Sequence, residues 1–199
     1  MKCGYSIPVF NIILIFSISI FLFGAKEVKM ADNERIILNF DKSDDSNNWI
    51  VINDVVMGGV SDSSFQFTKE GTGVFSGIVS LENNGGFASA NMNPSQFDLS
   101  DSDGIRFRIK GDGKKYKISL KNDGKFNGFS YRVEFSTKNH EWLILDAPFS
   151  SFTPMLMGQK TSASPIDRAS IKTFGFLIAD KQAGPFRLEI DWIGGYSKN

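Results

Sequence analysis

The feature that most constrains the fold of this chain is a two-residue alternation of apolar and polar side chains. Residues 105–110 read IRFRIK, residues 116–121 read YKISLK, and residues 131–136 read YRVEFS. Residues 186–192, FRLEIDW, close the chain with the same pattern. Successive residues of a β-strand point to opposite faces, so each stretch predicts a strand with one buried and one solvated face.

Shorter stretches extend this pattern along the chain, and no run of ten or more residues shows a helical period. We expect further strands near residues 36–40, 49–55, 64–69, 74–82, 86–92, 141–147 and 172–179. Turn sequences such as NNGG at 83–86 and GDG at 111–113 separate the strands, and we interpret 111–115 as a hairpin turn. About eleven short strands with tight connections predict an all-β fold, an antiparallel β-sandwich.

Aromatic residues within these stretches predict the core between the two sheets. The chain contains 19 Phe, and aromatic side chains suit the half-buried surface of a strand. Residues 150–170 contain two prolines and a glycine, so we expect them to form the longest irregular loop. We expect the core to use Trp49, Phe107, Phe135, Trp142, Phe174, Phe176 and Trp192.

The N-terminal residues differ from the rest in composition. Residues 12–23 form a dense apolar run, which matches the hydrophobic region of a signal peptide and is short for a membrane span. We expect a signal peptide or anchor at 1–25, a linker at 26–35 and a single sandwich domain at 36–199. The segment would tether the domain to a membrane or export it, and a start at Met30 would leave the domain cytoplasmic.

Charge and cysteine content limit the classes of partner and of metal site that we expect. The 22 basic and 22 acidic residues balance, so overall attraction to nucleic-acid phosphates is not expected. The single cysteine, Cys3, precedes the apolar run, so the domain has no disulfide or thiolate zinc site. Six basic residues are expected on neighbouring strands, where they form one positive sheet surface: Arg106, Arg108, Lys110, Lys115, Lys117 and Lys121. This surface is a solvated outer face or, alternatively, a concave surface that docks an acidic protein or a glycan.

The chain lacks a recognisable catalytic constellation. His140 is the only histidine and lies at a predicted strand start, and no Gly-x-Ser-x-Gly motif accompanies it. A calcium loop around residues 101–104 fails because Leu99 and Lys110 would fill its first and twelfth ligand positions. We expect no enzyme, no cofactor and no metal site. A structural calcium ion, and a carboxylate pair that acts on sugars, stay open as alternatives.

Three loop segments carry the candidate interaction residues. Residues 53–61 (NDVVMGGVS) and 80–89 (SLENNGGFAS) each contain paired glycines, which permit a positive φ or a close approach of the backbone. Residues 179–186 (ADKQAGPF) form a charged turn. The alternative is that all three are tight turns whose polar groups satisfy the local backbone. The candidates are Asp54, Met57, Gly58, Gly59, Ser61, Glu82, Asn83, Asn84, Gly86, Phe87 and Asp180.

Taken together and in this order, these segments resemble the complex I intermediate-associated protein 30 family, the NADH:ubiquinone oxidoreductase assembly-factor domain. The resemblance covers about residues 38–196, and its matching stretches are 53–61, 75–89, 104–114, Trp142 with 148–154, and 174–186. It implies a galactose-binding-domain-like jelly roll. It also implies a chaperone role in the assembly of respiratory complex I, without an assigned reaction.

The resemblance and the missing catalytic set predict a non-catalytic protein-binding module. Its expected partners are proteins, with respiratory complex subunits the leading possibility, and its membrane contact is limited to the N-terminal segment. The alternative is an exported carbohydrate-binding module, because jelly rolls with Asn, Asp and aromatic residues in their loops suit glycans. We expect Gly59→Arg or Asn84→Lys to abolish partner capture without unfolding the domain.

Overall fold

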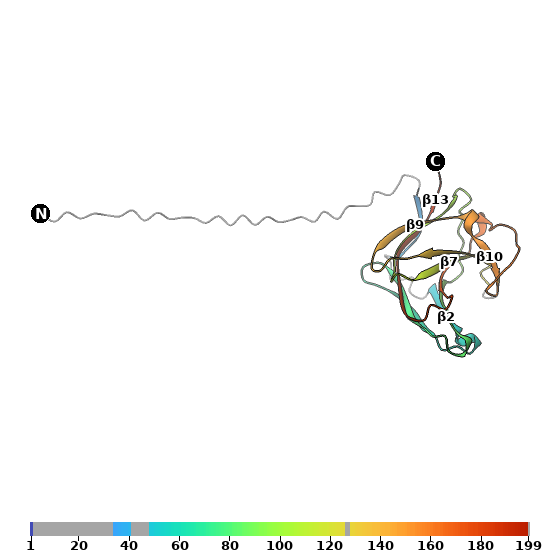
Figure 1. Ribbon diagram of the computed structural model, residues 1–199. Coiled ribbons are helices and arrows are strands. Elements are labelled where there is room, and N and C mark those ends of the chain that lie inside the picture. Colours follow the sequence, from blue (N-terminus) through green and yellow to red (C-terminus); the bar gives the residue numbers. More distant parts are fainter. Residues whose placement is uncertain (2–33, 41–47, 126–127, 199) are drawn as a thin grey trace. The chain divides into compact units, whose positions relative to one another are not determined.

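Two antiparallel β-sheets stack face to face in the computed structural model, which describes residue 1 and residues 34–40, 48–125 and 128–198 (Figure 1). The first sheet has the order β3-β4-β13-β6-β9, and β1 adds to β13. Its strands are β1 (Glu34–Asn39), β3 (Asp62–Phe67), β4 (Gly73–Val79), β6 (Gly104–Lys110), β9 (Trp142–Pro148) and β13 (Gly184–Tyr196).

The second sheet has the order β11-β10-β8-β7-β12-β5-β2. Its strands are β2 (Trp49–Asn53), β5 (Ala88–Met92), β7 (Lys115–Lys121), β8 (Ser130–Ser136), β10 (Thr153–Leu156), β11 (Gln159–Lys160) and β12 (Thr173–Ile178). Short 3₁₀ turns interrupt the loops at η2 (Asp54–Met57), η3 (Glu82–Asn84), η4 (Phe149–Ser151) and η5 (Arg168–Ser170). The predicted all-β, antiparallel sandwich is confirmed.

The alternation of side chains builds the core between the sheets. On β6, Ile105, Phe107 and Ile109 are buried, while the arginines between them are partly exposed. The Phe107 ring meets the Phe135 ring of the opposite sheet edge-on at 5.1 Å, and Phe135 meets Phe176 at 6.5 Å. Edge-to-face contacts of this kind add stability beyond the buried area.

Two of the predicted core residues point the other way. Trp142 lies opposite Lys110 on the outer face of the first sheet, with Arg108 and Lys110 over its ring at 4.4 and 4.7 Å from the centroid. Trp192 follows a shift of register in β13, after which Ile193 takes the inward position and Trp192 lies opposite Arg108, where it is still buried at 9% exposure. A β-bulge of this kind reverses the side-chain alternation that the sequence predicts.

The prediction of one positive sheet surface is wrong. Arg106, Arg108 and Lys110 lie on β6 in the first sheet, whereas the lysines of β7 lie in the second. The segment 111–114 is therefore not a hairpin turn, because β6 pairs with β13 and β9 while β7 pairs with β12 and β8. A connection that crosses between sheets separates basic residues that are close in the sequence.

The predicted long loop at 150–170 is more ordered than expected. Its first half contains β10 and β11, which form a hairpin closed by Met157 and Gly158 at φ values of 50° and 80°.

The apolar N-terminal run lies outside the described residues, so the proposed division of the chain stays a prediction. In the part of the chain that is described, no helix is long and apolar enough to span a membrane.

Candidate functional site

The three predicted interaction loops leave the sandwich at the same end. β2 ends at Asn53 opposite Ala88, the first residue of β5, and Ile178 at the end of β12 pairs with the same alanine. Gly184, the first residue of β13, pairs with Val79 at the end of β4. The strand register therefore gathers loops 54–61, 80–87 and 179–183 from distant parts of the sequence.

Asp54 connects two of these loops from the inside. Its side chain is fully buried, at 0% exposure. Oδ1 accepts a hydrogen bond from the Ser61 N–H at 2.9 Å, and Oδ2 accepts one from the Ser61 hydroxyl at 2.5 Å. The N–H groups of Gly86 and Phe87 donate to Oδ2 at 2.6 and 3.2 Å. We call this set, Asp54 with Ser61, Gly86 and Phe87, the Asp54 brace.

The brace keeps its carboxylate charged. Burial by itself raises the pKa of Asp54, but the hydrogen bonds from Ser61, Gly86 and Phe87 more than offset this effect. The pKa of Asp54 therefore lies below its ordinary value. A buried carboxylate whose oxygens all accept strong hydrogen bonds is a structural element, because its charge is already compensated.

The paired glycines make room for the brace. A Cβ on Gly59 would lie 2.4 Å from Cγ of Asp54, and one on Gly85 would lie 2.6 Å from its Oδ2. Gly58 instead adopts a φ of 90° in open space. Both expected uses of glycine are thus present. The expectation that Gly59→Arg leaves the fold intact is wrong, since any side chain there collides with Asp54.

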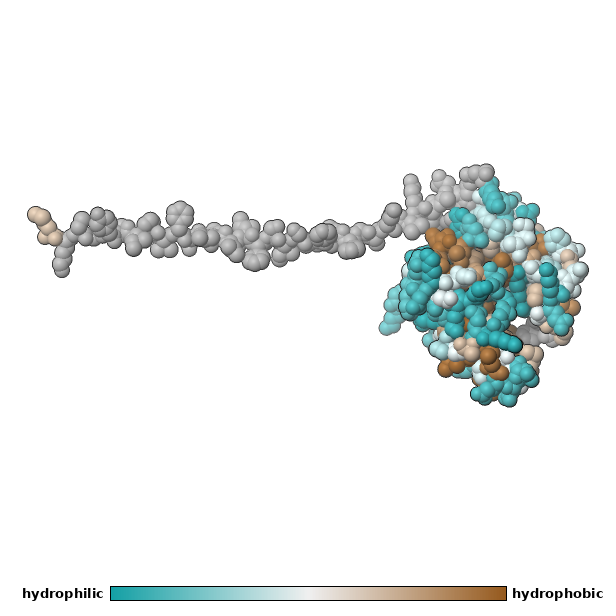
Figure 2. Space-filling model, in the orientation of Figure 1, coloured by the Kyte–Doolittle hydropathy of each residue, from teal (hydrophilic) through white to brown (hydrophobic). Residues whose placement is uncertain are grey.

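Exposed apolar side chains surround the brace. Met57 at the end of η2 is 69% exposed, and its neighbours in the same turn are two exposed valines. Figure 2 shows hydrophobic side chains beside hydrophilic ones at the lower end of the domain. The apolar tip, as we define it, consists of Val55, Val56, Met57, Val60, Ile78 and Leu81. Sequence reasoning singled out only Met57, although the run VVM lies outside any strand alternation.

Polar candidates border the apolar tip. Glu82, Asn83 and Asn84 are exposed, and the two asparagines adopt left-handed φ values of 53° and 59°. Asp180 forms an ion pair with Lys117 at 2.5 Å, which fixes the 179–183 turn to β7. The candidates thus divide into the internal brace, an exposed rim, and a turn neutralised by its neighbour.

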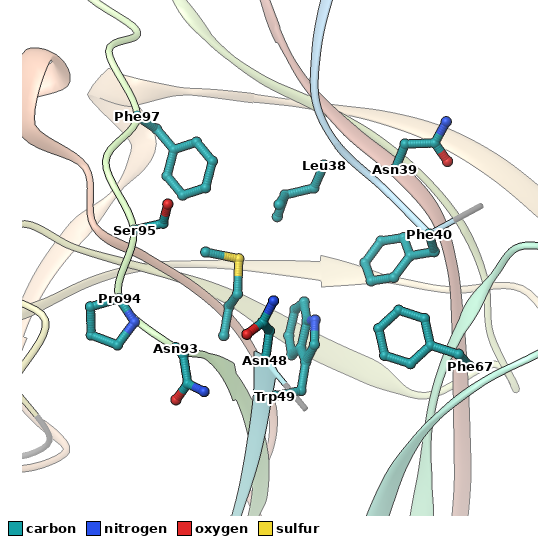
Figure 3. A pocket seen from close by; sticks show the side chains of 11 residues that line it. Leu38, Asn39, Phe40, Asn48, Trp49, Phe67, Asn93, Pro94, Ser95 and Phe97 are labelled. Carbon is teal, nitrogen blue, oxygen red and sulfur yellow. The ribbon is translucent and has the colours of Figure 1, made fainter. Parts of the chain in front are cut away.

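A cleft lies at the opposite end of β2, where Trp49 pairs with Met92. Its volume is about 300 Å³, and aromatic rings and amide side chains line it (Figure 3). The Trp49 ring stacks on Phe65 with the centroids 4.2 Å apart. No sequence pattern pointed to this cleft, because its lining comes from four separate segments. Within the described residues, no cluster of three metal-ligating side chains occurs.

The sequence model of the Complex I intermediate-associated protein 30 family matches residues 38–190. The chain belongs to this family. It is 26% identical to Complex I intermediate-associated protein 30, mitochondrial, of Mus musculus, covering 83% of this chain and 57% of that protein. The Drosophila melanogaster protein of the same name is 27% identical, with 80% and 62% covered. The chain therefore spans about three fifths of the curated relatives it matches.

Solved structures share the fold of this family member. A family 11 carbohydrate-binding module from Clostridium thermocellum, in complex with a β-1,3-1,4-mixed-linked tetrasaccharide, superposes with a TM-score of 0.63. The two are 20% identical over 84% of this chain and 98% of the module. The agarase AgWH50C matches at a TM-score of 0.59 and 13% identity, over 83% of this chain and 25% of the enzyme. At these identities the likeness establishes the jelly-roll fold.

Proposed function

We propose that this domain is the protein-binding module of a complex I assembly factor and that it docks through the apolar tip. The carrying observation is that six exposed apolar side chains lie on or beside two loops that a buried, fully hydrogen-bonded carboxylate joins. A rigid apolar surface loses little conformational entropy on binding, which favours a stable contact. Family membership and the names of the curated relatives support the assembly role.

Acidic side chains at the rim of the tip support a basic partner. Glu82 follows Leu81 directly, and Asp62 lies opposite Ile78 in the strand register. Both acidic side chains are exposed, and neither takes part in an ion pair with another described residue. We therefore propose an apolar protein segment flanked by Lys or Arg, carried by a respiratory complex subunit. The apolar residues before the domain would tether this chaperone to the membrane on which the complex assembles.

The test compares two exposed methionines. Met57 and Met157 are 69% and 81% exposed, and each precedes a glycine with positive φ. Met57→Glu should lower the recovery of complex I subunits by about tenfold, equivalent to ~1.4 kcal/mol of binding, in a crosslinked pull-down of the tagged full chain from native membranes. Met157→Glu should leave the recovery unchanged. Equal recovery with both variants would refute docking through the tip.

A carbohydrate-binding function is the second candidate, and the cleft favours it. Aromatic rings beside amide groups are a lining that sugars can use, and the exposed Asn48 lies at its edge. Soluble glucans would then raise the melting temperature of the chain, and Asn48→Ala would weaken this effect. No shift across a broad glycan panel, with and without calcium, would exclude this candidate. Enrichment of envelope proteins instead of respiratory subunits in the pull-down would favour it.

A further inference from the structure

Cations on the outer faces of the two sheets are almost all neutralised by an acidic neighbour. Arg106 forms a two-pronged pair with Asp146 at 2.5 and 2.8 Å, and Arg108 pairs with Asp191. The same holds for three lysines, in the pairs Lys110–Glu189, Lys115–Glu134 and Lys117–Asp180. One further arginine, Arg132, does not follow this pattern.

Arg132 lies on the outer face of the second sheet without such a partner. It follows the outward register of β8, opposite Ser119 on β7 and Thr153 on β10. Its Nε donates to the Ser130 hydroxyl at 3.1 Å, and no described acidic side chain forms an ion pair with it. Burial lowers the pKa of the Arg132 guanidinium. A desolvated cation normally has a counter-charge, because desolvation alone is costly.

A second cation lies beside Arg132. Lys121 is two residues along β7 from Ser119, the register partner of Arg132, so the two are diagonal neighbours on one face. Burial lowers the pKa of Lys121, and the charge of Arg132 lowers it further, while Asp123 acts in the opposite direction. The Lys121 ammonium donates to the carbonyl of Lys125 at 2.9 Å. The fold thus holds two like charges together in a desolvated position.

An unsatisfied hydroxyl completes the arrangement. Thr173 pairs with Lys121 in the register of β12 and β7, and the alternation of β12 directs it to the same outer face. The residue is 5% exposed, and its Oγ1 has no hydrogen-bond partner among the described residues. A buried polar atom without a partner is rare, since it costs about 1–3 kcal/mol. Gly175 lies opposite Ser119 in the same register, and the side-chain oxygen of Asn91 would lie 2.5 Å from a Cβ placed on it.

We propose that Arg132, Lys121 and Thr173 form a binding site for an oxyanion, a phosphate or a carboxylate group, on the outer face of the second sheet. The guanidinium would donate a two-pronged pair of hydrogen bonds to two oxygens of the group, as Arg106 does to Asp146. The Thr173 hydroxyl would donate a further one. The site is separate from the apolar tip, because Lys121 and Thr173 lie at the ends of β7 and β12 remote from the 179–183 turn.

The test is a titration of the full chain with sodium phosphate and with sodium citrate, each against sodium chloride at equal ionic strength. At least one of the two should raise the melting temperature in a saturable way, and the comparison identifies the preferred oxyanion. Arg132→Gln should weaken that binding by about tenfold or more. Arg106→Gln is the matched control, because its guanidinium already has a carboxylate partner, and it should bind as the wild type does.

Thr173→Val separates binding from folding. Without a ligand this variant should melt at the wild-type temperature or above, because it removes an unsatisfied buried hydroxyl. Its affinity for the preferred oxyanion should nevertheless fall about threefold. Two results would overturn the proposal: neither phosphate nor citrate exceeds chloride, or Arg132→Gln and Arg106→Gln weaken the binding equally.

Discussion

The fold removes Asp54 fully and Arg132 partly from water, but the surroundings of the two charges are opposite. The Asp54 carboxylate accepts four hydrogen bonds from two loops, so its charge is compensated within the domain. The Arg132 guanidinium donates to one serine hydroxyl and lies beside Lys121, another cation. A buried charge whose hydrogen bonds are all made within the domain stabilises the fold. A charge with few partners can still donate hydrogen bonds to a ligand.

The largest expected effect comes from neutralising the satisfied charge. Asp54→Asn should lower the free energy of unfolding by about 3 kcal/mol, because the new amide N–H₂ would face N–H and O–H donors in a buried site. Urea denaturation measures this loss. Asp62→Asn, at an exposed position, should change stability by less than about 0.5 kcal/mol. Equal stability of both variants would contradict the structural role of the brace.

A smaller effect should follow from removing one donor to the same carboxylate. Ser61→Ala loses the hydroxyl that donates to Oδ2 of Asp54 and accepts from the N–H of Ser80. The expected cost is about 1–2 kcal/mol at neutral pH.

This cost should depend on pH in a defined direction. The folded-state pKa of Asp54 lies below its unfolded value, so the stabilisation is complete above pH ~4 and is lost as the pH falls through the folded pKa. The difference between wild type and Ser61→Ala should therefore narrow in acid when unfolding is measured along a pH series. A gap that stays constant with pH would mean that the hydroxyl does not act through the Asp54 charge.

The smallest expected effect concerns the unsatisfied charge. Arg132→Met should change the free energy of unfolding by less than about 1 kcal/mol, or stabilise the domain, because an apolar chain replaces a partly desolvated cation that has no ion-pair partner among the described residues. Arg108→Met should cost more, since it breaks the pair with Asp191 and the contact with the Trp142 ring. Chemical denaturation of both variants measures the two changes in the free energy of unfolding. A cost at Arg132 as large as that at Asp54 would assign the guanidinium a structural role.

Local patterns predicted the strands because alternation requires only neighbouring residues. The stretch 105–110 became β6 (Gly104–Lys110), and 116–121 became β7 (Lys115–Lys121). The same logic failed at Trp192, where a bulge in β13 reverses the faces, and at the basic residues, which the chain distributes over two sheets. Bulges and sheet crossings depend on pairing with distant strands, so no local pattern reveals them.

The candidate loops were recognised by their residue types, but their roles were not. Asp54 is a polar loop residue in the sequence, but its hydrogen bonds come from Ser61 at the end of its own loop and from Gly86 and Phe87 in the next one. Arg132 reads as one polar position in an alternating strand, and nothing near it in the sequence signals the missing counter-charge. A pattern of residue types cannot report which donors meet which acceptors in space.

By itself, the sequence determined the all-β class, most of the strand positions and the loops in which glycine is required, because each follows from side-chain periodicity or backbone freedom over a few residues. Only the tertiary structure decided that three loops share one end of the sandwich, that Asp54 is an internal brace and that Arg132 forms no ion pair within the described part of the chain. The physical reason is range: burial and electrostatic compensation are sums over neighbours in space, and strand register brings those neighbours from far apart in the chain.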